Sequence, residues 1–219
     1  MKFATQLALL TFLPAVAMAT TDAPRNVGLV VQDSVRVMGS TSVQFPVRVD
    51  NTLVVKWSTL WLFDMLHYDH GTGKVKNQLN NRVFVGWAPL FGIGPAFQRQ
   101  DFSGRMPSNY LGASWTYAHS FRDDLKFSNF IEMARGLNVE TWRFDEYLNV
   151  TLPLGFWVSD SFAMEIGGPK LLPSNKLYVG LAVLDTKNAT ASVVVNQTVA
   201  IGRATVYMAG LEIKLKGAL

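Results

Sequence analysis

Apolar and polar residues alternate along most of this chain, in segments of about ten residues separated by Gly, Pro, Asp and Asn. A period of two predicts β-strands, because successive side chains of a strand point to opposite faces of a sheet. Between Asn109 and Phe121, apolar and aromatic side chains predominate at the odd positions, whereas small or hydroxylated side chains occupy the even positions. The chain is therefore predicted to be all-β.

We expect about ten to twelve strands. The candidate strands are Val43 to Val49, Leu53 to Met65, Arg82 to Gly94, Asn109 to Phe121, Leu125 to Ala134, Trp142 to Leu152, Ser161 to Gly167, Leu177 to Asp185, Ser192 to Ile201 and Arg203 to Lys216. Pro46 would make the first an edge or bulged strand. Asp124 to Gly136 also fits helical spacing, with Asp123 as N-cap, but its alternation favours a strand.

The first nineteen residues have the features of a secretory signal peptide. Lys2 supplies the positive charge, Leu7 to Leu13 the apolar stretch, and Ala17-Met18-Ala19 the small residues of a cleavage site. The mature chain is expected to begin at Thr20. No internal repeat or linker is evident after that point, which predicts a single domain over residues 20–219.

The alternation resembles that of a membrane barrel more than that of a soluble sheet. Only 16% of the residues are charged and 49% are hydrophobic, whereas soluble proteins have roughly 25% charged residues. In hydrocarbon every backbone amide needs a partner, so the strands of a membrane sheet must close into a barrel. We predict a single closed antiparallel up-and-down barrel in a lipid bilayer. Six tryptophans are candidates for its interfacial girdles: Trp57, Trp61, Trp87, Trp115, Trp142 and Trp157.

Two hairpins carry a resemblance to a known class of proteins. Trp115 to Phe130, with the acidic turn Arg122-Asp123-Asp124, and Leu152 to Ile166, with a turn at Trp157 to Phe162, look like Gram-negative outer-membrane β-barrel proteins. The resemblance implies an outer-membrane location and a passive pore or a structural barrel.

A fainter similarity concerns Ser34 to Ser40, followed by Phe63-Asp64 and Tyr68. These residues resemble the N-terminal region of nucleoside-specific channel proteins. That family implies passive diffusion of nucleosides, but none of its substrate-contacting residues can be matched to a position here.

Charged residues opposite the apolar rows are candidates for the lining of a lumen, where charge of both signs sets selectivity. They would equally suit a solvated sheet face. The candidates are Lys56, Asp64, Lys126, Glu132, Arg143, Asp145, Glu212 and Lys214.

Other chemistry has weak support in the sequence. Cysteine is absent, which excludes thiolate chemistry and disulfides. Asp64, His67, Asp69 and His70 could offer metal ligands, but His67 and His70 point to opposite faces of an extended chain. The pair His119 and Ser120 suggests a barrel-embedded lipid hydrolase, and strand neighbours again face opposite sides. We predict no metal site, no cofactor and no enzyme activity.

The partners expected are the lipid bilayer and small solutes, and the pattern is compatible with a homo-oligomer. Nucleic acid is not expected, because the 20 basic and 16 acidic residues are spread without a basic run. The alternative is an extracellular β-sandwich or jelly roll, secreted or from a virion, that acts by self-assembly or ligand binding. Leu177 to Leu219, rich in Val, Ala and Thr, supports that alternative.

Overall fold

The computed structural model describes residues 29–42, 44–88, 92–167, 173–200 and 204–218, so the predicted signal peptide lies outside the described residues. Over these ranges the chain forms twelve strands and one short 3-10 turn, η1 (Pro153–Gly155). The strands are β1 (Val30–Ser40), β2 (Val47–Trp57), β3 (Leu60–His70), β4 (Gln78–Trp87), β5 (Ile93–Phe102), β6 (Ser108–Arg122), β7 (Leu125–Gly136), β8 (Trp142–Thr151), β9 (Phe156–Ile166), β10 (Ser174–Asp185), β11 (Ala189–Ala200) and β12 (Val206–Ala218).

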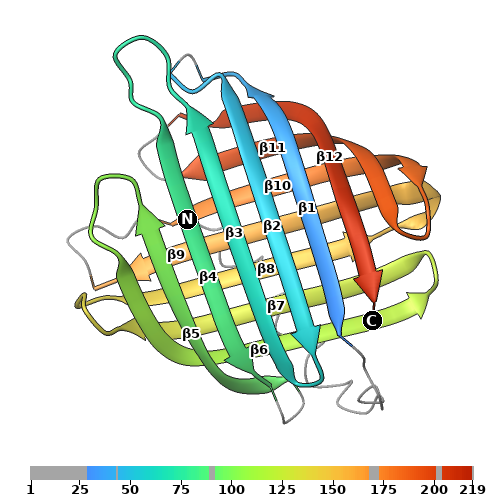
Figure 1. Cartoon of the computed structure of the whole chain (residues 1–219), viewed down its shortest axis with the longest axis horizontal. Helices are drawn as coiled ribbons and strands as arrows, with labels where there is room; N and C mark the ends of the chain where they lie inside the picture. The colour runs from blue at the N-terminus through green and yellow to red at the C-terminus, as the bar shows by residue number, and fades with distance from the viewer. Residues whose placement is uncertain (1–28, 43, 89–91, 168–172, 201–203, 219) are drawn as a thin grey trace, which may run out of the picture.

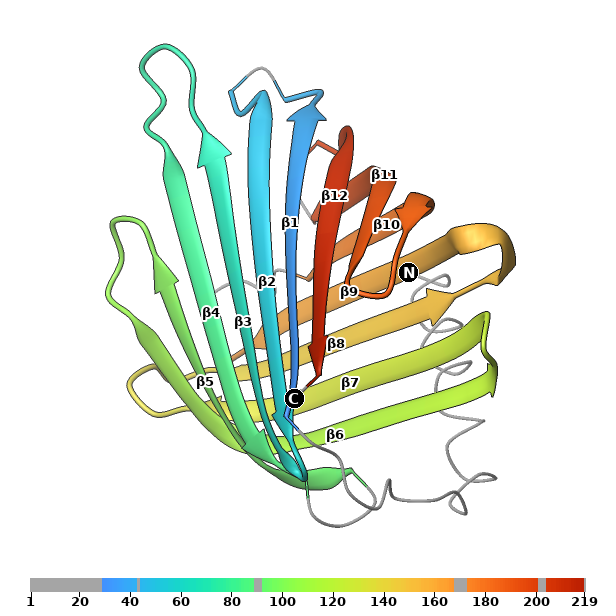
Figure 2. The same ribbon diagram turned by 45° about the vertical axis from the view of Figure 1, so that its right-hand side comes forward.

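Each strand pairs antiparallel with its neighbours in sequence, and β12 returns to pair with β1, so the sheet closes. Figures 1 and 2 show β1 to β4 running across the front of the barrel while β6 to β9 run behind them at a steep angle. The prediction of a closed up-and-down barrel of ten to twelve strands is confirmed, and the alternative of two stacked open sheets is wrong. Because the sheet is closed, each of the twelve described strands has a neighbour on both sides and none is an edge strand.

The two ends of the barrel differ in the length of their connections. The start of β1 and the end of β12 lie together, at the end that also carries the turns Ser58-Thr59 and Asp123-Asp124. Longer connections, such as residues 71–77 and 103–107, lie at the opposite end. We call these the short-turn end and the long-loop end. The predicted acidic turn at Asp123-Asp124 is confirmed.

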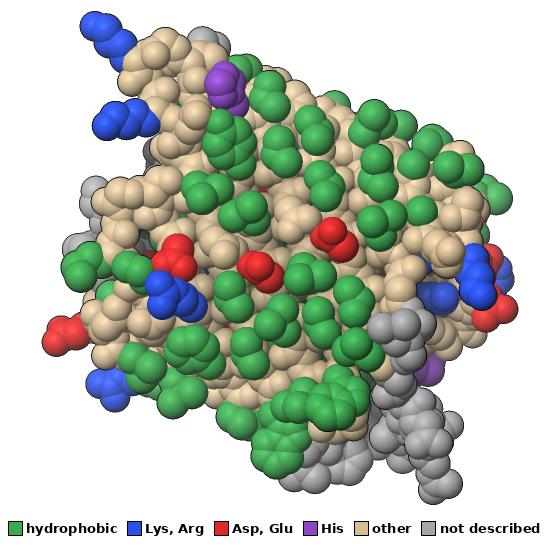
Figure 3. Space-filling model, in the orientation of Figure 1, with side chains coloured by type: hydrophobic (Ala, Val, Ile, Leu, Met, Phe, Trp, Pro, Cys, Tyr) green, Lys and Arg blue, Asp and Glu red, His purple; other side chains and the backbone are tan. Residues whose placement is uncertain are grey.

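The outer surface of the barrel is mainly apolar. Alternate side chains such as Val35, Val37, Leu211, Ile213 and Leu215 are exposed on it by 40 to 61%. Figure 3 shows hydrophobic side chains spread over β1 to β4, interrupted by a few acidic ones. Among the described residues, no helix has the length and apolar character that a membrane span would need.

One missed turn changes which side chains face the interior. The sequence predicts a continuous strand from Leu53 to Met65, but Ser58-Thr59 forms a tight turn between β2 and β3, with Ser58 at a φ of 54°. Trp57 pairs with Leu60 across this turn, so both point outward. From Leu60 onward the even-numbered residues therefore point outward and the odd-numbered residues point into the barrel, the reverse of the order in β2. Trp61 and Met65 are consequently buried inside the barrel, on the opposite face from the one occupied by Leu53 and Val55.

Other strand predictions are corrected in detail. The candidate strand from Arg82 to Gly94 covers the end of β4, the connection after it and the first residues of β5, so β5 was missed. The predicted turn at Trp157 to Phe162 is wrong, because these residues are paired within β9 and the chain turns at η1. The ambiguous segment before Gly136 is the strand β7, as favoured by its alternation.

Aligning the strands reveals an internal correspondence that the sequence alone did not suggest. The strands β2, β3 and β4 match β8, β9 and β10 at similar spacing. The matched residues are Arg48 and Arg143, Asp50 and Asp145, Trp61 and Trp157, Asp64 and Asp160, Asn81 and Asn175, Arg82 and Lys176, Phe84 and Tyr178, and Gly86 and Gly180. These matches are scattered along the strands, so they do not form a repeat that the sequence alone displays.

The matched residues also have matched surroundings. Trp61 pairs with Gly86 in the β3 and β4 register, and Trp157 pairs with Gly180 in the β9 and β10 register. In both places the indole lies against the glycine so closely that a Cβ would overlap the ring. The first six strands and the last six thus form two halves of the barrel with equivalent positions.

Candidate functional site

The interior of the barrel is lined by polar, charged and aromatic side chains. Those least exposed include Asp50, Phe84, Gln98, Glu132, Asp145 and Glu212, each exposed by 1% or less. They alternate along their strands with outward side chains that are mainly apolar, as Leu211, Glu212 and Ile213 on β12 illustrate. This division places the polar face inside the closed sheet and the apolar face outside.

The structure places seven of the eight predicted lining residues at positions whose register faces the interior. These are Lys56, Lys126, Glu132, Arg143, Asp145, Glu212 and Lys214. Asp64 lies between the interior residues Phe63 and Met65 on β3, so its side chain is on the outer face. The same missed turn at Ser58-Thr59 accounts for its misplacement.

Lysines gather on the inward face near the short-turn end. Lys56 is the second to last residue of β2, and Lys126 is the second residue of β7. Lys214 and Lys216 lie near the end of β12, which is also at the short-turn end. The Lys214 ammonium lies 5.7 Å from the centre of the Trp157 ring, and Lys216 pairs with Asp185 at 2.9 Å. This mouth of the barrel is therefore basic.

An aromatic layer connects opposite walls of the barrel. Trp61 and Phe63 on β3, and Phe84 on β4, meet Phe130 on β7 and Tyr147 on β8. The ring centres of Trp61 and Phe130 are 5.1 Å apart, and those of Phe63 and Tyr147 are 5.6 Å apart. Such edge-on distances are normal for packed aromatic rings. The layer therefore narrows the interior where it crosses from β3 and β4 to β7 and β8.

A second set of contacts crosses the interior between β1, β2 and β10. The Arg36 guanidinium lies 4.6 Å from the centre of the Tyr178 ring and 5.6 Å from that of Trp157. The Tyr178 hydroxyl donates a hydrogen bond to Asp50 at 3.3 Å. Arg36 also donates to Glu212 on the adjacent strand at 2.7 Å. This cation is thus held by carboxylate and aromatic groups together.

Ion pairs occupy the part of the interior toward the long loops. Arg143 donates two hydrogen bonds to Asp145, at 2.6 and 2.8 Å, and Arg82 approaches Asp145 from the opposite wall at 3.5 Å. Arg48 forms a similar two-bond pair with Asp69. Buried charges of both signs therefore neutralise one another within β8, across the interior from β4 to β8, and between the neighbouring strands β2 and β3.

The weaker chemical candidates are separated by the strand geometry. His67 and Asp69 face the interior, where His67 Nδ1 lies 2.6 Å from Asp50 Oδ1, whereas Asp64 and His70 belong to the outer face. No cluster of three potential metal ligands is found among the described residues. His119 packs against Phe121 on the outer face of β6, and its neighbour Ser120 faces inward. The arrangement brings neither candidate site together.

The tryptophans divide between the two faces. Trp57 and Trp87 are exposed on the outer face near the short-turn end, by 63% and 49%, and Trp142 is exposed near the long-loop end. These three suit an interfacial girdle. Trp61 and Trp157 instead face the interior.

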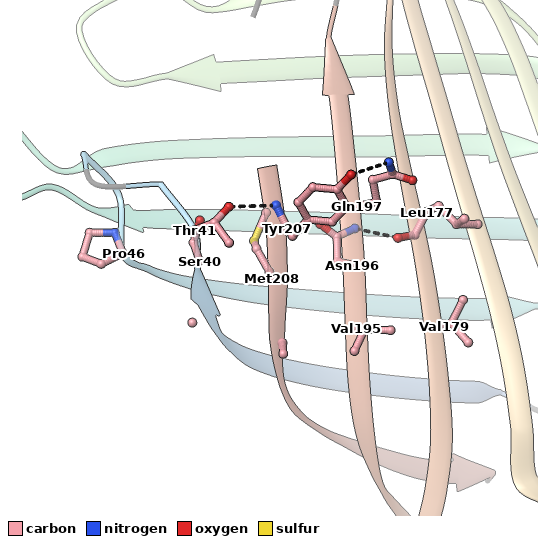
Figure 4. Close-up of a pocket in the computed structure, with 12 residues that line it drawn as sticks. Ser40, Thr41, Pro46, Leu177, Val179, Val195, Asn196, Gln197, Tyr207 and Met208 are labelled. Carbon is pink, nitrogen blue, oxygen red and sulfur yellow. Dashed lines mark hydrogen bonds between the residues drawn. The ribbon is translucent and has the colours of Figure 1, made fainter. Parts of the chain in front are cut away.

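A groove on the barrel wall lies apart from the interior. It is formed mainly by outward residues of β10, β11 and β12 near the loop that carries Pro46, and Leu177, Val179 and Val195 lie along it (Figure 4). In Figure 4 the Gln197 amide reaches the Tyr207 hydroxyl, and these atoms are 3.4 Å apart. The groove belongs to the apolar outer surface.

Comparison with known proteins gives similarity of fold. No family model matches the chain, and no curated protein matches its sequence. The solved structure of the KdgM porin covers 83% of this chain, and 97% of the porin is covered, with a TM-score of 0.51 and 12% identity. The same values describe the KdgM porin in complex with disordered oligogalacturonate. The CymD monoaromatic hydrocarbon channel matches with a TM-score of 0.47 and 7% identity, covering 93% of this chain and 92% of that protein.

Proposed function

We propose that this protein is an outer-membrane barrel that passes small polar solutes through a narrow interior. The observation that carries the proposal is the division of the closed sheet into an apolar outer face and a charged inner face. Lipid favours the first face, and a water-filled path with charged walls favours the second. The fold that this chain shares with the KdgM porin supports the same function.

The aromatic layer would set the size of the solutes that pass. Trp61, Phe63, Phe84, Phe130 and Tyr147 pack against one another across the interior at one level, so a solute must pass beside their rings or displace them. A structural barrel without transport is the second candidate, and this packed layer is the observation that favours it. Catalysis is not part of the proposal, since His119 and Ser120 lie on opposite faces of β6.

Two solute classes deserve a direct comparison. The KdgM porin structure contains oligogalacturonate, and Arg82 and Lys176 face the interior of this barrel, where they could attract an acidic sugar. Nucleosides are the second class, because the faint resemblance of Ser34 to Ser40 implies them and aromatic rings can stack with bases.

Liposome swelling tests the proposal. Vesicles containing the refolded chain should swell in small sugars, galacturonate or nucleosides, and the rate should fall steeply with solute size. Vesicles prepared without protein provide the baseline. Swelling no faster than this baseline for every solute, with the barrel folded, would favour the structural barrel.

A further inference from the structure

The two halves of the barrel differ in charge at one pair of equivalent positions. Arg36 on β1 pairs in register with Asp50 and Glu212, whereas Glu132 on β7 pairs in register with Asp145 and Ser114. Since Asp50 corresponds to Asp145, Arg36 corresponds to Glu132. One half therefore holds a cation between two carboxylates, and the other half holds a carboxylate beside another carboxylate.

Glu132 is buried without a hydrogen-bonding partner in the part of the chain that the structure describes. Its side chain is 1% exposed, and neither of its carboxylate oxygens accepts a hydrogen bond from the described residues. The Ser114 hydroxyl opposite it is buried and also without a hydrogen bond. Arg143 is the nearby cation, but its guanidinium is bound to both oxygens of Asp145. The charged form of a carboxylate in this state is costly, and the cost is relieved when the group takes up a proton or when a cation joins it.

Arg36 shows how a cation can be held at the equivalent place. The Arg36 guanidinium lies against the rings of Trp157 and Tyr178 and pairs with Glu212. The rings equivalent to Trp157 and Tyr178 are those of Trp61 and Phe84. Organic cations are attracted to aromatic faces, and more strongly when they are desolvated.

From this comparison we propose that Glu132, together with Trp61 and Phe84, binds an organic cation that carries N–H donors, such as the ammonium or guanidinium group of a solute. The Phe130 ring fills the place in the structure, 5.1 Å from the Trp61 ring and 5.9 Å from the Phe84 ring. Its equivalent in the first half is the small residue Ser34. The cation must therefore displace the Phe130 ring from between Trp61 and Phe84 to reach Glu132. Phe130 and Glu132 are two residues apart on the same face of β7.

Binding to the full chain in detergent tests the proposal, measured by equilibrium dialysis with methylguanidinium, methylammonium and tetramethylammonium chlorides. At least one of the first two should bind saturably at one site, and tetramethylammonium, which has no N–H donor, should bind more weakly. E132Q should weaken binding by about tenfold or more, because it removes a charged hydrogen-bond acceptor. F130A should strengthen binding, because it clears the place between the rings.

Two further variants control for folding and charge. E146Q removes a carboxylate from the outer face of β8 and should leave binding unchanged. The double variant Glu132→Arg with Ser114→Glu copies the Arg36 and Glu212 pair and should abolish binding while the barrel keeps its heat-modifiable mobility in gels. Equal binding by E132Q, or no binding by both the wild type and F130A, would overturn the proposal.

The site extends the proposed function but can fail separately from it. Binding in detergent without solute passage in vesicles would leave the site in place and reject the channel. Solute passage in vesicles without cation binding in detergent would support the channel and reject the cation site.

Discussion

The ring of Trp61 on β3 meets the ring of Phe130 on β7 edge-on, with centres 5.1 Å apart, across the interior of the barrel. These strands are four apart in the order of the closed sheet, and β3 lies in front of β7 in Figure 1. The contact therefore joins the two halves of the barrel where its interior narrows. The same packed rings that stabilise the fold would also obstruct a solute that passes through the interior.

The first prediction concerns the orientation of the barrel in the membrane. Because the chain has no cysteine, single cysteines can report which end faces outward. In outer-membrane barrels the longer loops face the medium and the short turns face the periplasm. K74C should react with a membrane-impermeant thiol reagent on intact cells, and D123C should react only after permeabilisation. The reverse pattern would contradict this orientation.

The second prediction concerns the buried carboxylate Asp145. It is 0% exposed and neutralises Arg143 and Arg82, so D145N should lower the free energy of unfolding by about 3 to 5 kcal/mol. Urea titration in lipid vesicles measures the change. D185N is the matched control, because Asp185 forms an exposed pair with Lys216 and should cost no more than about 1 kcal/mol. Similar costs for the two variants would show that the buried network contributes little.

The third prediction concerns the basic mouth at the short-turn end. Charge reversal by K56E, K126E and K214E together should move the reversal potential in a salt gradient toward cation selectivity, because charged rings set the selectivity of a pore. Lys74 lies in the connection between β3 and β4 at the other end, so K74E should have a smaller effect. An unchanged reversal potential in the triple variant would mean that ions do not pass these lysines.

The fourth prediction concerns carboxylates on the outer face. Asp64 and Asp160 occupy equivalent positions in the two halves, each paired in register with a leucine. Replacing a lipid-facing carboxylate by Leu should raise the free energy of unfolding by roughly 1 kcal/mol. D64L and D160L in urea titrations test this expectation, with L62A as a control that should destabilise. Destabilisation by both Asp variants would show that lipid does not cover these positions, as expected if another copy of the chain did.

The sequence was sufficient to predict the barrel because the alternation of apolar and polar residues along a strand indicates which side chains face lipid. Between Asn109 and Phe121 the predicted outward and inward sets agree with the register of β6. The strand β5 was missed because polar side chains lie on both of its faces: the neutral Gln98 and Gln100 point inward, and the charged Arg99 and Asp101 pair with each other on the outer face.

The aromatic layer could not be predicted from the same signal. Ser58-Thr59 contains none of the Gly, Pro or Asn residues that mark most tight turns, so the apolar row of β2 was continued into β3. That continuation placed Trp61 and Phe63 outside. The correspondence of the two halves was missed because its matched residues are scattered, and register is needed to see that Trp61 with Gly86 repeats as Trp157 with Gly180.

The central claim is that solutes pass through the interior of the barrel, and single-channel conductance in planar lipid bilayers tests it most directly. The wild type, F130A and the outer-face control F156A are compared at equal protein concentration. The account predicts small or brief conductance steps for the wild type, larger and longer steps for F130A, and no change for F156A, whose side chain lies on the outer surface. Folded wild-type and F130A barrels that both insert without any conductance would contradict a solute path through the interior.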